Sequence, residues 1–400
     1  MTSVWSWKGQ RPARGWRAIF YGRIPWLTID WPVLLLAVAM VFVGLVFIEE
    51  MAVTEEYYGR DKINLAGHMK KLAVALPCLV FGLLVRPRFL RQNTGLLYGA
   101  VIVLLMLVPF IGEERNNARR WIPMPLGFDI QPSELAKIGL ILALARALYR
   151  NRLRRPIDWA IPAGLALLPM GLVAAQPDLG TALTIVPVTL GLFWVAGAKG
   201  RMLASLVGMC VLLGSMAWQF EWVQGYQKKR IDTWATSFSN EALIDNKNGA
   251  GYHTYHARVV IGNGGMFGTG LGKGVANAAA HLPERDCDSI FCVIAEEGGF
   301  VGASFLVIFY LLFGGLLLAA AARTRERYSR LVVAGVGLYF TAHFLINAGV
   351  NLGLLPMTGL TLPLISTGGS SLMASFLALG LASGLSARQE PTLDMDAFRS

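Results

Sequence analysis

The sequence predicts an all-α polytopic membrane protein with about ten transmembrane helices, both termini cytoplasmic and one large extracytoplasmic loop. Of its 400 residues, 54% are hydrophobic and only 15% are charged, and the mean hydropathy is +0.51. Soluble domains carry about 25% charged residues. The stretch 31–48 has no charge over 18 residues, about the length that crosses a bilayer.

Ten segments are long and apolar enough to predict membrane spans. They are 31–48, 65–85, 94–112, 131–149, 157–175, 179–198, 202–220, 301–322, 331–350 and 370–387. The Lys and Arg residues beside the spans set the orientation, because short cytoplasmic segments carry an excess of both. With the N-terminus inside, the cytoplasmic segments hold 21 Lys and Arg residues and the short outer loops hold 7. Both termini are therefore predicted inside, and the long segment 221–288 outside.

One membrane domain, 31–387, is predicted between two short cytoplasmic ends. Residues 1–30 mix Trp and Arg in a pattern typical of an interfacial anchor, and 388–400 form a tail. The formal net charge of +11 comes mostly from the cytoplasmic bias, which meets the anionic headgroups of membrane lipids, so no nucleic acid is needed to explain it. We expect Cys287 and Cys292 to be free thiols, because helical spacing would turn them apart.

A glycine-dense segment, 262–274, invites a nucleotide-binding interpretation that its spacing excludes. A P-loop would need glycine at position 267 and Ser or Thr at position 274, where Phe267 and Gly274 stand. A dinucleotide site would need a strand, a tight turn and a helix in a soluble unit, and nothing of that kind flanks the segment. We favour a plain loop over a backbone surface that a phosphate or sugar approaches.

Polar residues recur where predicted spans meet the outer side. In "ARRWIPMPLGFDIQPSELAK" (118–137), Glu134 and Lys137 are three residues apart, share one helix face and can pair. One interpretation is a structural ion pair. The other is a polar cavity lined by the pair, with Arg120 above it to meet an anionic group.

Two further outer motifs have a structural and a functional interpretation. In "QPDLGTA" (176–182), a tight hairpin between two spans, Asp178 could cap the next helix or face the same cavity. The loop "STGGSS" (366–371) carries no Lys or Arg. Its hydroxyls, including those of Ser366 and Ser370, suit phosphate or sugar, and a flexible turn is an equal alternative.

The acidic segment "HLPERDCDSIF" (281–291) stands directly before an apolar run. A helix would align Glu284 with Asp288, and Arg285 could neutralise one of them. A carboxylate at the edge of a low-dielectric cavity gains basicity and can act as a general base. An ion pair or a helix cap is the alternative. These residues alone indicate a transporter or a membrane enzyme with an outward-facing acidic site.

Taken in order, six motifs resemble the SEDS family, the RodA and FtsW proteins of bacterial cell-wall synthesis. They are "ARRW…QPSELAK", "QPDLGTA", "YQKKRI", "GAGYH…IGNGG", "LPERDCDSIF…AEEGGFVG" and "GLLPMTGLTLPLISTGGSS", and the likeness runs from about residue 30 to 386. The family's fold, a ten-span α-helical bundle with both ends cytoplasmic, agrees with the charge count. Cys287 stands where the family usually has Thr, and Thr367 where it usually has Tyr.

The resemblance implies a peptidoglycan glycosyltransferase in the bacterial cytoplasmic (inner) membrane. It would polymerise lipid II and undecaprenyl-diphosphate-linked glycan, with a class B penicillin-binding protein as partner. Asp288 stands at the position of the family's essential acid. The resemblance therefore implies that Asp288 acts as the general base of an inverting glycosyl transfer. Arg120, Glu134 and Lys137 take the polar-cavity positions, and Asp178 the hairpin aspartate.

The resemblance by itself identifies neither a cofactor nor the subfamily. Arg120 and Lys137 are candidates for stabilising diphosphate charge, with a divalent cation, Mg²⁺ or Mn²⁺, as a further candidate. "QPDLGTAL" and "YQKKRI" favour RodA and elongation over FtsW and division, although "GLTLPL" points the other way. A precursor flippase and a non-catalytic scaffold for a penicillin-binding protein are the rival functions.

Overall fold

The computed structural model is a long bundle of α-helices. It describes residues 19–20, 26–60, 63–115, 118–124, 128–151, 153, 155–219, 225–239, 244, 249, 251–279 and 282–388. Most of the predicted interfacial segment 1–30 and of the tail 388–400 lies outside the described residues.

Each predicted span coincides with a helix. The ten helices are α2 (Trp31–Tyr57), α3 (Leu65–Leu84), α4 (Pro87–Ile111), α5 (Pro132–Leu148), α6 (Ala160–Ala175), α7 (Leu179–Ala196), α8 (Gly200–Gln219), α13 (Ile290–Arg323), α14 (Arg327–Asn351) and α15 (Gly369–Ala387). Within the described part of the chain, seven of them are long and apolar enough to cross a membrane, and α7 and α8 contain shorter apolar helices. The prediction of an all-α polytopic membrane protein is confirmed, and its orientation stays a prediction.

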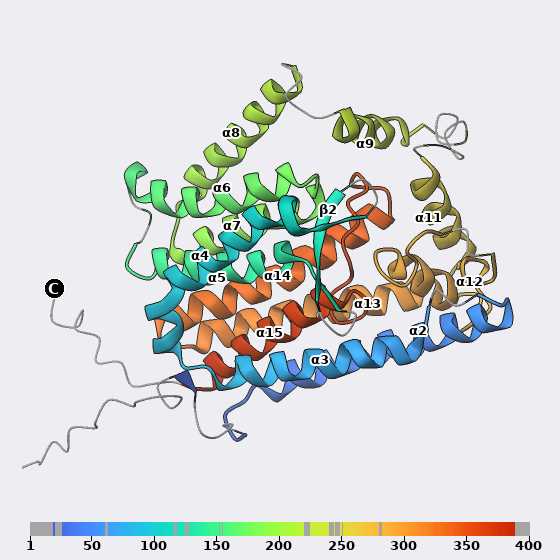
Figure 1. Cartoon of the computed structure of the whole chain (residues 1–400), viewed down its shortest axis with the longest axis horizontal. Helices are drawn as coiled ribbons and strands as arrows, with labels where there is room; N and C mark the ends of the chain where they lie inside the picture. Colours follow the sequence, from blue (N-terminus) through green and yellow to red (C-terminus); the bar gives the residue numbers. More distant parts are fainter. Residues whose placement is uncertain are drawn as a thin grey trace, which may run out of the picture.

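The helices form an inner group and an outer group. About 83% of the α14 and α15 spans is buried inside the protein, against 28% of α3, α4 and α6, which turn most of their surface outward. Helix α15 packs along α3, and α14 packs against α13, α7 and α5 (Figure 1). Gly380 and Gly384 let α15 approach the backbone of α3 at Leu79 and Leu83, where a Cβ atom would collide.

Helices α2 and α13 extend furthest beyond their predicted spans. Helix α2 continues to Tyr57, and its buried Glu55 forms an ion pair with Arg60. Helix α13 begins at Ile290, eleven residues before the predicted span, and is interrupted at Gly299 (φ 66°, ψ −166°). Only glycine adopts that backbone conformation readily.

The predicted outer loops contain structure that the sequence did not indicate. Strands β1 (Glu113–Arg115), β2 (Ala118–Met124) and β3 (Phe128–Ile130) form a small antiparallel sheet in the order β1-β2-β3. The large loop holds α9 (Gly225–Thr236), α11 (Tyr252–Asn263) and α12 (Val275–Ala279), which gather at one end of the bundle (Figure 1). The strands and α12 are too short for hydrophobic periodicity to reveal, and the polar sequence of α9 hides it among loop residues.

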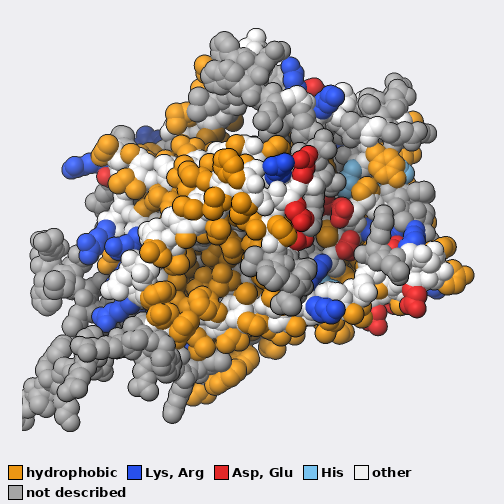
Figure 2. Space-filling model, in the orientation of Figure 1, with side chains coloured by type: hydrophobic (Ala, Val, Ile, Leu, Met, Phe, Trp, Pro, Cys, Tyr) orange, Lys and Arg blue, Asp and Glu red, His pale blue; other side chains and the backbone are white. Residues whose placement is uncertain are grey.

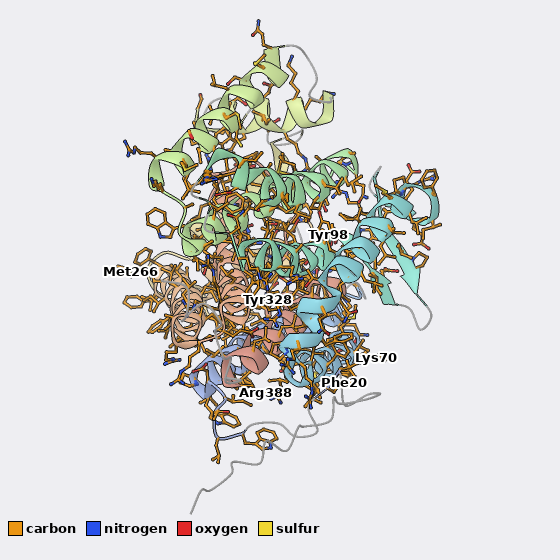
Figure 3. The ribbon with its side chains drawn as sticks, turned by 90° about the vertical axis from the view of Figure 1, so that its left-hand side faces the viewer. Phe20, Lys70, Tyr98, Met266, Tyr328 and Arg388 are labelled. Atoms are coloured by element: carbon orange, nitrogen blue, oxygen red, sulfur yellow. The ribbon has the colours of Figure 1, made fainter. Side chains whose placement is uncertain are left out.

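The surface reflects the membrane setting. Hydrophobic side chains cover the middle of one face, Lys and Arg lie toward both ends, and most acidic side chains lie toward the end away from the C-terminus (Figure 2). Turned by 90°, the bundle holds Tyr328 in its interior, while Met266 of the glycine-dense segment points away from it (Figure 3).

Candidate functional site

The acidic segment folds as consecutive turns from Pro283 to Asp288, not as a helix. Glu284 has a positive φ of 45°, which a helix does not allow. The expectation that a helix aligns Glu284 with Asp288 is therefore wrong. Their spacing fitted a helix, but Pro283 and the start of α13 at Ile290 bound a segment that turns back on itself. We call residues 282–289 the acidic loop.

Asp288 is half-buried at the end of the acidic loop, and its backbone is held firmly. Asn347 and Asn351, one turn apart on α14, donate side-chain hydrogen bonds to the Asp288 carbonyl oxygen at 2.9 and 3.0 Å. The Ser289 hydroxyl donates to Asp288 Oδ1 at 3.1 Å. Among the described residues, neither Lys nor Arg forms an ion pair with this carboxylate.

The surroundings of Asp288 make its carboxylate basic. Burial among neighbouring atoms raises the pKa of Asp288 to about 7, and the hydrogen bond from Ser289 opposes that rise. Part of the side chain remains open to solvent. A carboxylate that is deeply placed, still accessible and half protonated near neutral pH suits proton transfer.

The segment 359–368 packs onto the acidic loop through backbone and hydroxyl contacts. Thr367 donates its N–H to the Asp286 carbonyl at 3.0 Å and its hydroxyl to the Asp286 carboxylate. Ser366 donates to the Cys287 carbonyl, and its own hydroxyl accepts from Leu362 N at 2.8 Å. Ser366 therefore connects the two loops, and its expected contact with substrate stays a prediction.

Lys71 lies beside this junction and was not identified from the sequence. Its ammonium group, at the beginning of α3, donates to the Thr367 carbonyl at 2.9 Å. The two residues are 296 positions apart, so no local pattern could connect them.

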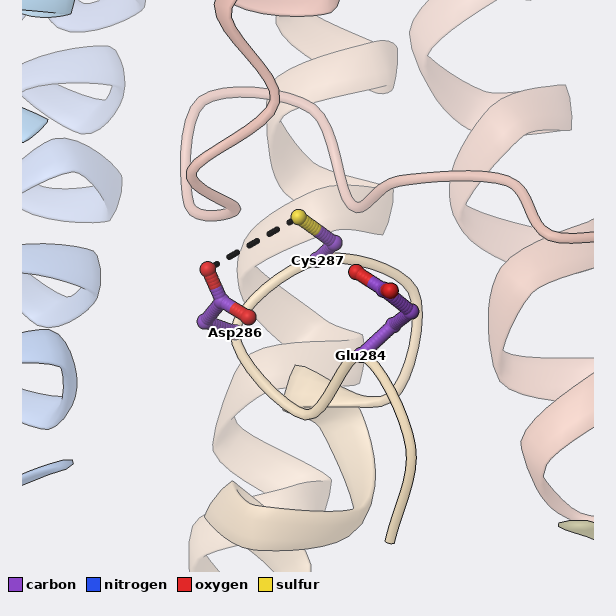
Figure 4. Close-up of side chains that lie close together, drawn as sticks. All are labelled: Glu284, Asp286 and Cys287. Carbon is purple, nitrogen blue, oxygen red and sulfur yellow. Dashed lines mark hydrogen bonds between the residues drawn. The ribbon is translucent and has the colours of Figure 1, made fainter. Parts of the chain in front are cut away.

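Glu284, Asp286 and Cys287 offer side-chain atoms that lie within 4.8 Å of one another (Figure 4). The two carboxylates suit Mg²⁺ or Mn²⁺, which bind through one or two carboxylates together with substrate phosphates. The thiol does not suit them. Burial and the Asp286 carboxylate raise the pKa of Cys287, so the sulfur stays protonated and bonds Thr367 Oγ1 at 3.2 Å. The cluster therefore fits a hard cation through its carboxylates alone.

Arg285 turns away from the acidic side chains that flank it. Its guanidinium forms a buried ion pair with Glu55 of α2 and donates to the carbonyl oxygens of Ala276 and Asn277 at 3.0 and 2.9 Å. The expected neutralisation of Glu284 or Asp288 by Arg285 is therefore not observed. The partner, Glu55, comes from 230 residues away and leaves the two acidic side chains without this cation.

Asp178 caps α7 and also organises a second polar cluster. Its Oδ1 accepts from Thr181 N at 3.2 Å, as the capping interpretation predicted. Its Oδ2 accepts from Gln131 Nε2 at 2.9 Å and from the Ser133 hydroxyl at 3.2 Å. Arg120 of β2 approaches Asp178 Oδ1 at 4.0 Å.

Arg120 and Ser370 connect this second cluster to the sheet of β1, β2 and β3. The Arg120 guanidinium donates to the carbonyl oxygens of Gln176, at 3.2 Å, and Pro177. Ser370 donates to the Asp129 carbonyl at 2.5 Å and accepts from Gln131 N at 2.9 Å. Both residues hold loops together here, and a contact with substrate stays a prediction for each.

Glu134 and Lys137 form the predicted ion pair, with 2.6 Å between Lys137 Nζ and Glu134 Oε1. Both side chains are buried, and Lys137 Nζ lies 2.7 Å from Nε2 of His343 on α14. The structural interpretation of the pair is supported. Lys137 is only 3% exposed, so this structure gives no support to its expected contact with a diphosphate.

The glycine-dense segment is ordered by two buried acids that were not identified from the sequence. The Glu296 carboxylate accepts from the backbone N–H groups of Val275 and Ala276 at 3.1 and 2.9 Å. The Glu297 carboxylate accepts from Gly272 N at 3.1 Å. Phe300 N donates to the Gly265 carbonyl across the interruption of α13. The glycines allow this close packing, and residues 264–274 form an irregular loop of turns and bends, as favoured from the sequence.

The chain is similar to known proteins along most of its length. A family model described as "Cell cycle protein", covering FtsW, RodA and SpoVE, matches residues 30–390. The chain is 34% identical over 373 residues to a probable peptidoglycan glycosyltransferase FtsW of Thiomicrospira cyclica, covering 88% of this chain and 90% of that protein. It is 32% identical over 327 residues to the peptidoglycan glycosyltransferase MrdB of Escherichia coli strain K12, covering 81% and 85%.

A longer relative and two solved structures complete the comparison. The chain is 36% identical over 312 residues to a probable FtsW of Mycobacterium tuberculosis, but spans only 57% of that protein's length and matches over 76% of its own. A structure titled "Structural coordination of polymerization and crosslinking by a peptidoglycan synthase complex" is similar with a TM-score of 0.76 and 32% identity, covering 92% of this chain and 100% of the other. The rod shape determining protein RodA of Thermus thermophilus gives 0.67 and 33%, covering 92% and 99%.

Proposed function

The chain belongs to the FtsW, RodA and SpoVE family, also called SEDS, and from that premise we propose that it is a peptidoglycan glycosyltransferase. It polymerises lipid II into glycan strands at the outer face of the bacterial cytoplasmic membrane. The relatives named as peptidoglycan glycosyltransferases support the reaction class. The placement of Asp288 supports a chemical role within it.

Asp288 is the general base of the proposed reaction. It takes the proton from the 4-hydroxyl of an acceptor GlcNAc as that oxygen attacks C1 of the donor MurNAc. The bond between C1 and the diphosphate oxygen breaks, and the diphosphate leaves with the electron pair. One displacement at C1 converts the α-linkage into a β-linkage, so the reaction inverts the centre and needs one base and no covalent intermediate.

The observation that carries this role is the combination of three features at one residue. Asp288 has a fixed backbone, an accessible carboxylate with a pKa near 7 and no ion-pair partner among the described residues. A base must be deprotonated in part at the working pH and must receive a proton from outside the protein. The buried Glu134, Glu296 and Glu297 have protein partners instead.

Glu284 and Asp286 would hold a divalent cation, Mg²⁺ or Mn²⁺, which would supply positive charge to a substrate diphosphate. Asp286 is kept in position by the hydroxyl of Thr367, and Glu284 is exposed at the turn. The acidic loop would thus present the base and the cation ligands on one short segment.

The proposed polymerase works with a class B penicillin-binding protein, which crosslinks the strands. A structural relative is described as part of a complex that coordinates polymerization and crosslinking, and this supports such a partner. We favour a role in elongation, on the motifs "QPDLGTAL" and "YQKKRI". Depletion in cells should then give round cells, whereas filaments would indicate division.

Polymer formation from labelled lipid II tests the proposal. The purified chain is assayed with and without a co-expressed class B penicillin-binding protein whose transpeptidase is blocked. Removing a general base costs about 10²–10⁴-fold. We therefore expect strands from the wild type and at least a hundredfold less from Asp288→Asn, with an unchanged thermal unfolding midpoint.

The other outcomes separate the rival functions. Equal polymer from Asp288→Asn would place the base elsewhere. No polymer from the wild type with any partner would overturn the polymerase. Transport of lipid II across vesicles by that same protein would then identify a flippase, and retained partner binding alone would identify a scaffold.

A further inference from the structure

A pocket of about 270 Å³ opens between α9, α11 and the segment before α15. Its lining residues are Lys229, Arg230, Thr233, Trp234, His253, Thr254 and Met357. Four of them come from one face of α9, where residues three and four apart are neighbours. Arg230 fixes this helix to the opposite wall by donating to the Met357 carbonyl at 2.9 Å.

The pocket is built for a negatively charged group. Lys229 and Arg230 provide two positive charges, and none of the seven lining residues is acidic. Thr233 and Thr254 add hydroxyl groups to the lining. Burial, with Arg230 and His256 nearby, lowers the pKa of His253 to about 4, so this ring is neutral at physiological pH.

Trp234 supplies an independent indication of a ligand. Its indole Nε1 is buried and has no hydrogen-bond partner within the part of the chain that the structure describes. An indole N–H can only donate, and leaving a buried donor unpaired costs about 1–3 kcal/mol. Trp234 also lines the pocket, and a ligand oxygen that reached this N–H would remove that cost.

The pocket wall connects directly to the proposed base. His253 Nε2 lies 3.2 Å from the Ser289 hydroxyl, which donates to Asp288 Oδ1 at 3.1 Å. When neutral His253 carries its proton on Nε2, it donates to the Ser289 hydroxyl, and that hydroxyl donates to the Asp288 carboxylate. These two hydrogen bonds then run in one direction, from the pocket toward the carboxylate. The pocket therefore adjoins the place where Asp288 would receive a proton.

We propose that this pocket binds the diphosphate of the polyprenyl-linked substrate, with Lys229, Arg230 and the Trp234 N–H as its ligands. The inference rests on the proposed function. In that reaction the leaving oxygen is bonded both to the reacting carbon and to phosphorus, so the diphosphate must lie within a few bonds of the hydroxyl that Asp288 deprotonates. Lys229 and Arg230 thus take the role that Lys137, buried in its ion pair, does not fulfil here.

Binding of undecaprenyl diphosphate to the full-length chain in detergent, measured by native mass spectrometry at fixed Mg²⁺, tests the proposal. We expect the double variant Lys229→Gln/Arg230→Gln to bind at least about tenfold more weakly, because a hydrogen bond to a charged group is typically worth 1.5–3 kcal/mol. Trp234→Phe keeps an aromatic side chain and removes the donor, and should lose about threefold. Lys228→Gln, which removes a charge from the same helix outside the pocket lining, should stay within about twofold.

The controls make each outcome decisive. Lys229→Gln alone provides the test if the double variant fails to fold, because the hydrogen bond described at Lys229 uses its backbone carbonyl, which the substitution keeps. Unchanged affinity in the pocket variants, or an equal loss in Lys228→Gln, would overturn the proposal. Equal competition by phosphatidylglycerol would show a lipid headgroup site, and equal competition by inorganic pyrophosphate would show that the polyprenyl chain contributes nothing.

This readout does not require turnover. If the wild type binds undecaprenyl diphosphate through these residues but makes no polymer, the pocket stands and the polymerase fails. If Asp288→Asn binds as well as the wild type and makes no polymer, the binding pocket and the base are separate functions of neighbouring residues.

Discussion

Asp288 of the acidic loop and Glu134 of the bundle interior have opposite surroundings. Glu134 is 4% exposed and is paired with Lys137, which also contacts His343. Asp288 remains partly accessible, and its side chain receives a hydrogen bond from Ser289 but no described ion pair. A buried charge needs a partner to be tolerated. An acid that has no cationic partner and keeps access to solvent is therefore the better candidate for chemistry.

The largest expected effect concerns the stability of the buried pair. Lys137→Met leaves Glu134 charged and unpaired, and breaking a buried pair in this way costs about 3–5 kcal/mol. We expect a large fall in the thermal unfolding midpoint, measured in detergent. Asp288→Asn, which breaks no ion pair, should move it little.

A double variant sharpens this prediction. Glu134→Gln/Lys137→Met removes both charges, and should recover most of the stability lost in Lys137→Met. If Lys137→Met unfolds at the wild-type temperature, the pair contributes nothing and the contrast with Asp288 is lost.

The second expected effect is a pH dependence of polymerisation set by Asp288. Its pKa is raised to about 7, and a base works only when deprotonated, so the initial rate should rise with pH through about 7 and then level off. One unit below the pKa, the rate should be about tenfold below its plateau. Initial rates at constant cation concentration measure this.

Ser289→Ala provides the matching control for the pH profile. The Ser289 hydrogen bond stabilises the charged carboxylate and lowers the pKa of Asp288. Its removal should therefore shift the midpoint of the rate profile to higher pH. An unchanged midpoint would mean that the rate reports another group.

The smallest expected effect is at the junction of the two loops. Thr367→Val removes the hydroxyl that donates to the Asp286 carboxylate, while the Lys71 contact to the Thr367 carbonyl remains. We expect a loss of about 1 kcal/mol in unfolding free energy and a modest fall in rate. Thr367→Ser keeps the donor and should behave as the wild type. Equal losses in the two variants would point to packing of the methyl group instead.

Local patterns were sufficient for much of the fold and for part of the site. Long apolar segments located the ten helices, and the three-residue spacing of Glu134 and Lys137 predicted their contact. The position of Asp178 before an apolar run predicted its cap on α7. Each of these inferences depends on residues close together in sequence, for which hydrophobicity and helix geometry fix the outcome.

The same local reasoning failed where a distant residue competed. Arg285 stands between Glu284 and Asp286 in sequence, yet it pairs with Glu55 of α2. Glu296 and Glu297 lie outside every predicted span, yet in the structure they belong to α13 and order the glycine-dense segment. Lys71 and Thr367 meet from the two ends of the chain.

The sequence by itself determined which segments enter the membrane, because the energy of placing a residue in hydrocarbon depends mainly on that residue and its near neighbours. Only the tertiary structure decided which acids are paired and that Asp288 stays accessible. Ion pairs and hydrogen bonds act over a few ångströms, and the fold brings together Arg285 and Glu55 across 230 residues. The same contacts hold Asp288 apart from any described cation and leave its carboxylate open at the edge of the acidic loop.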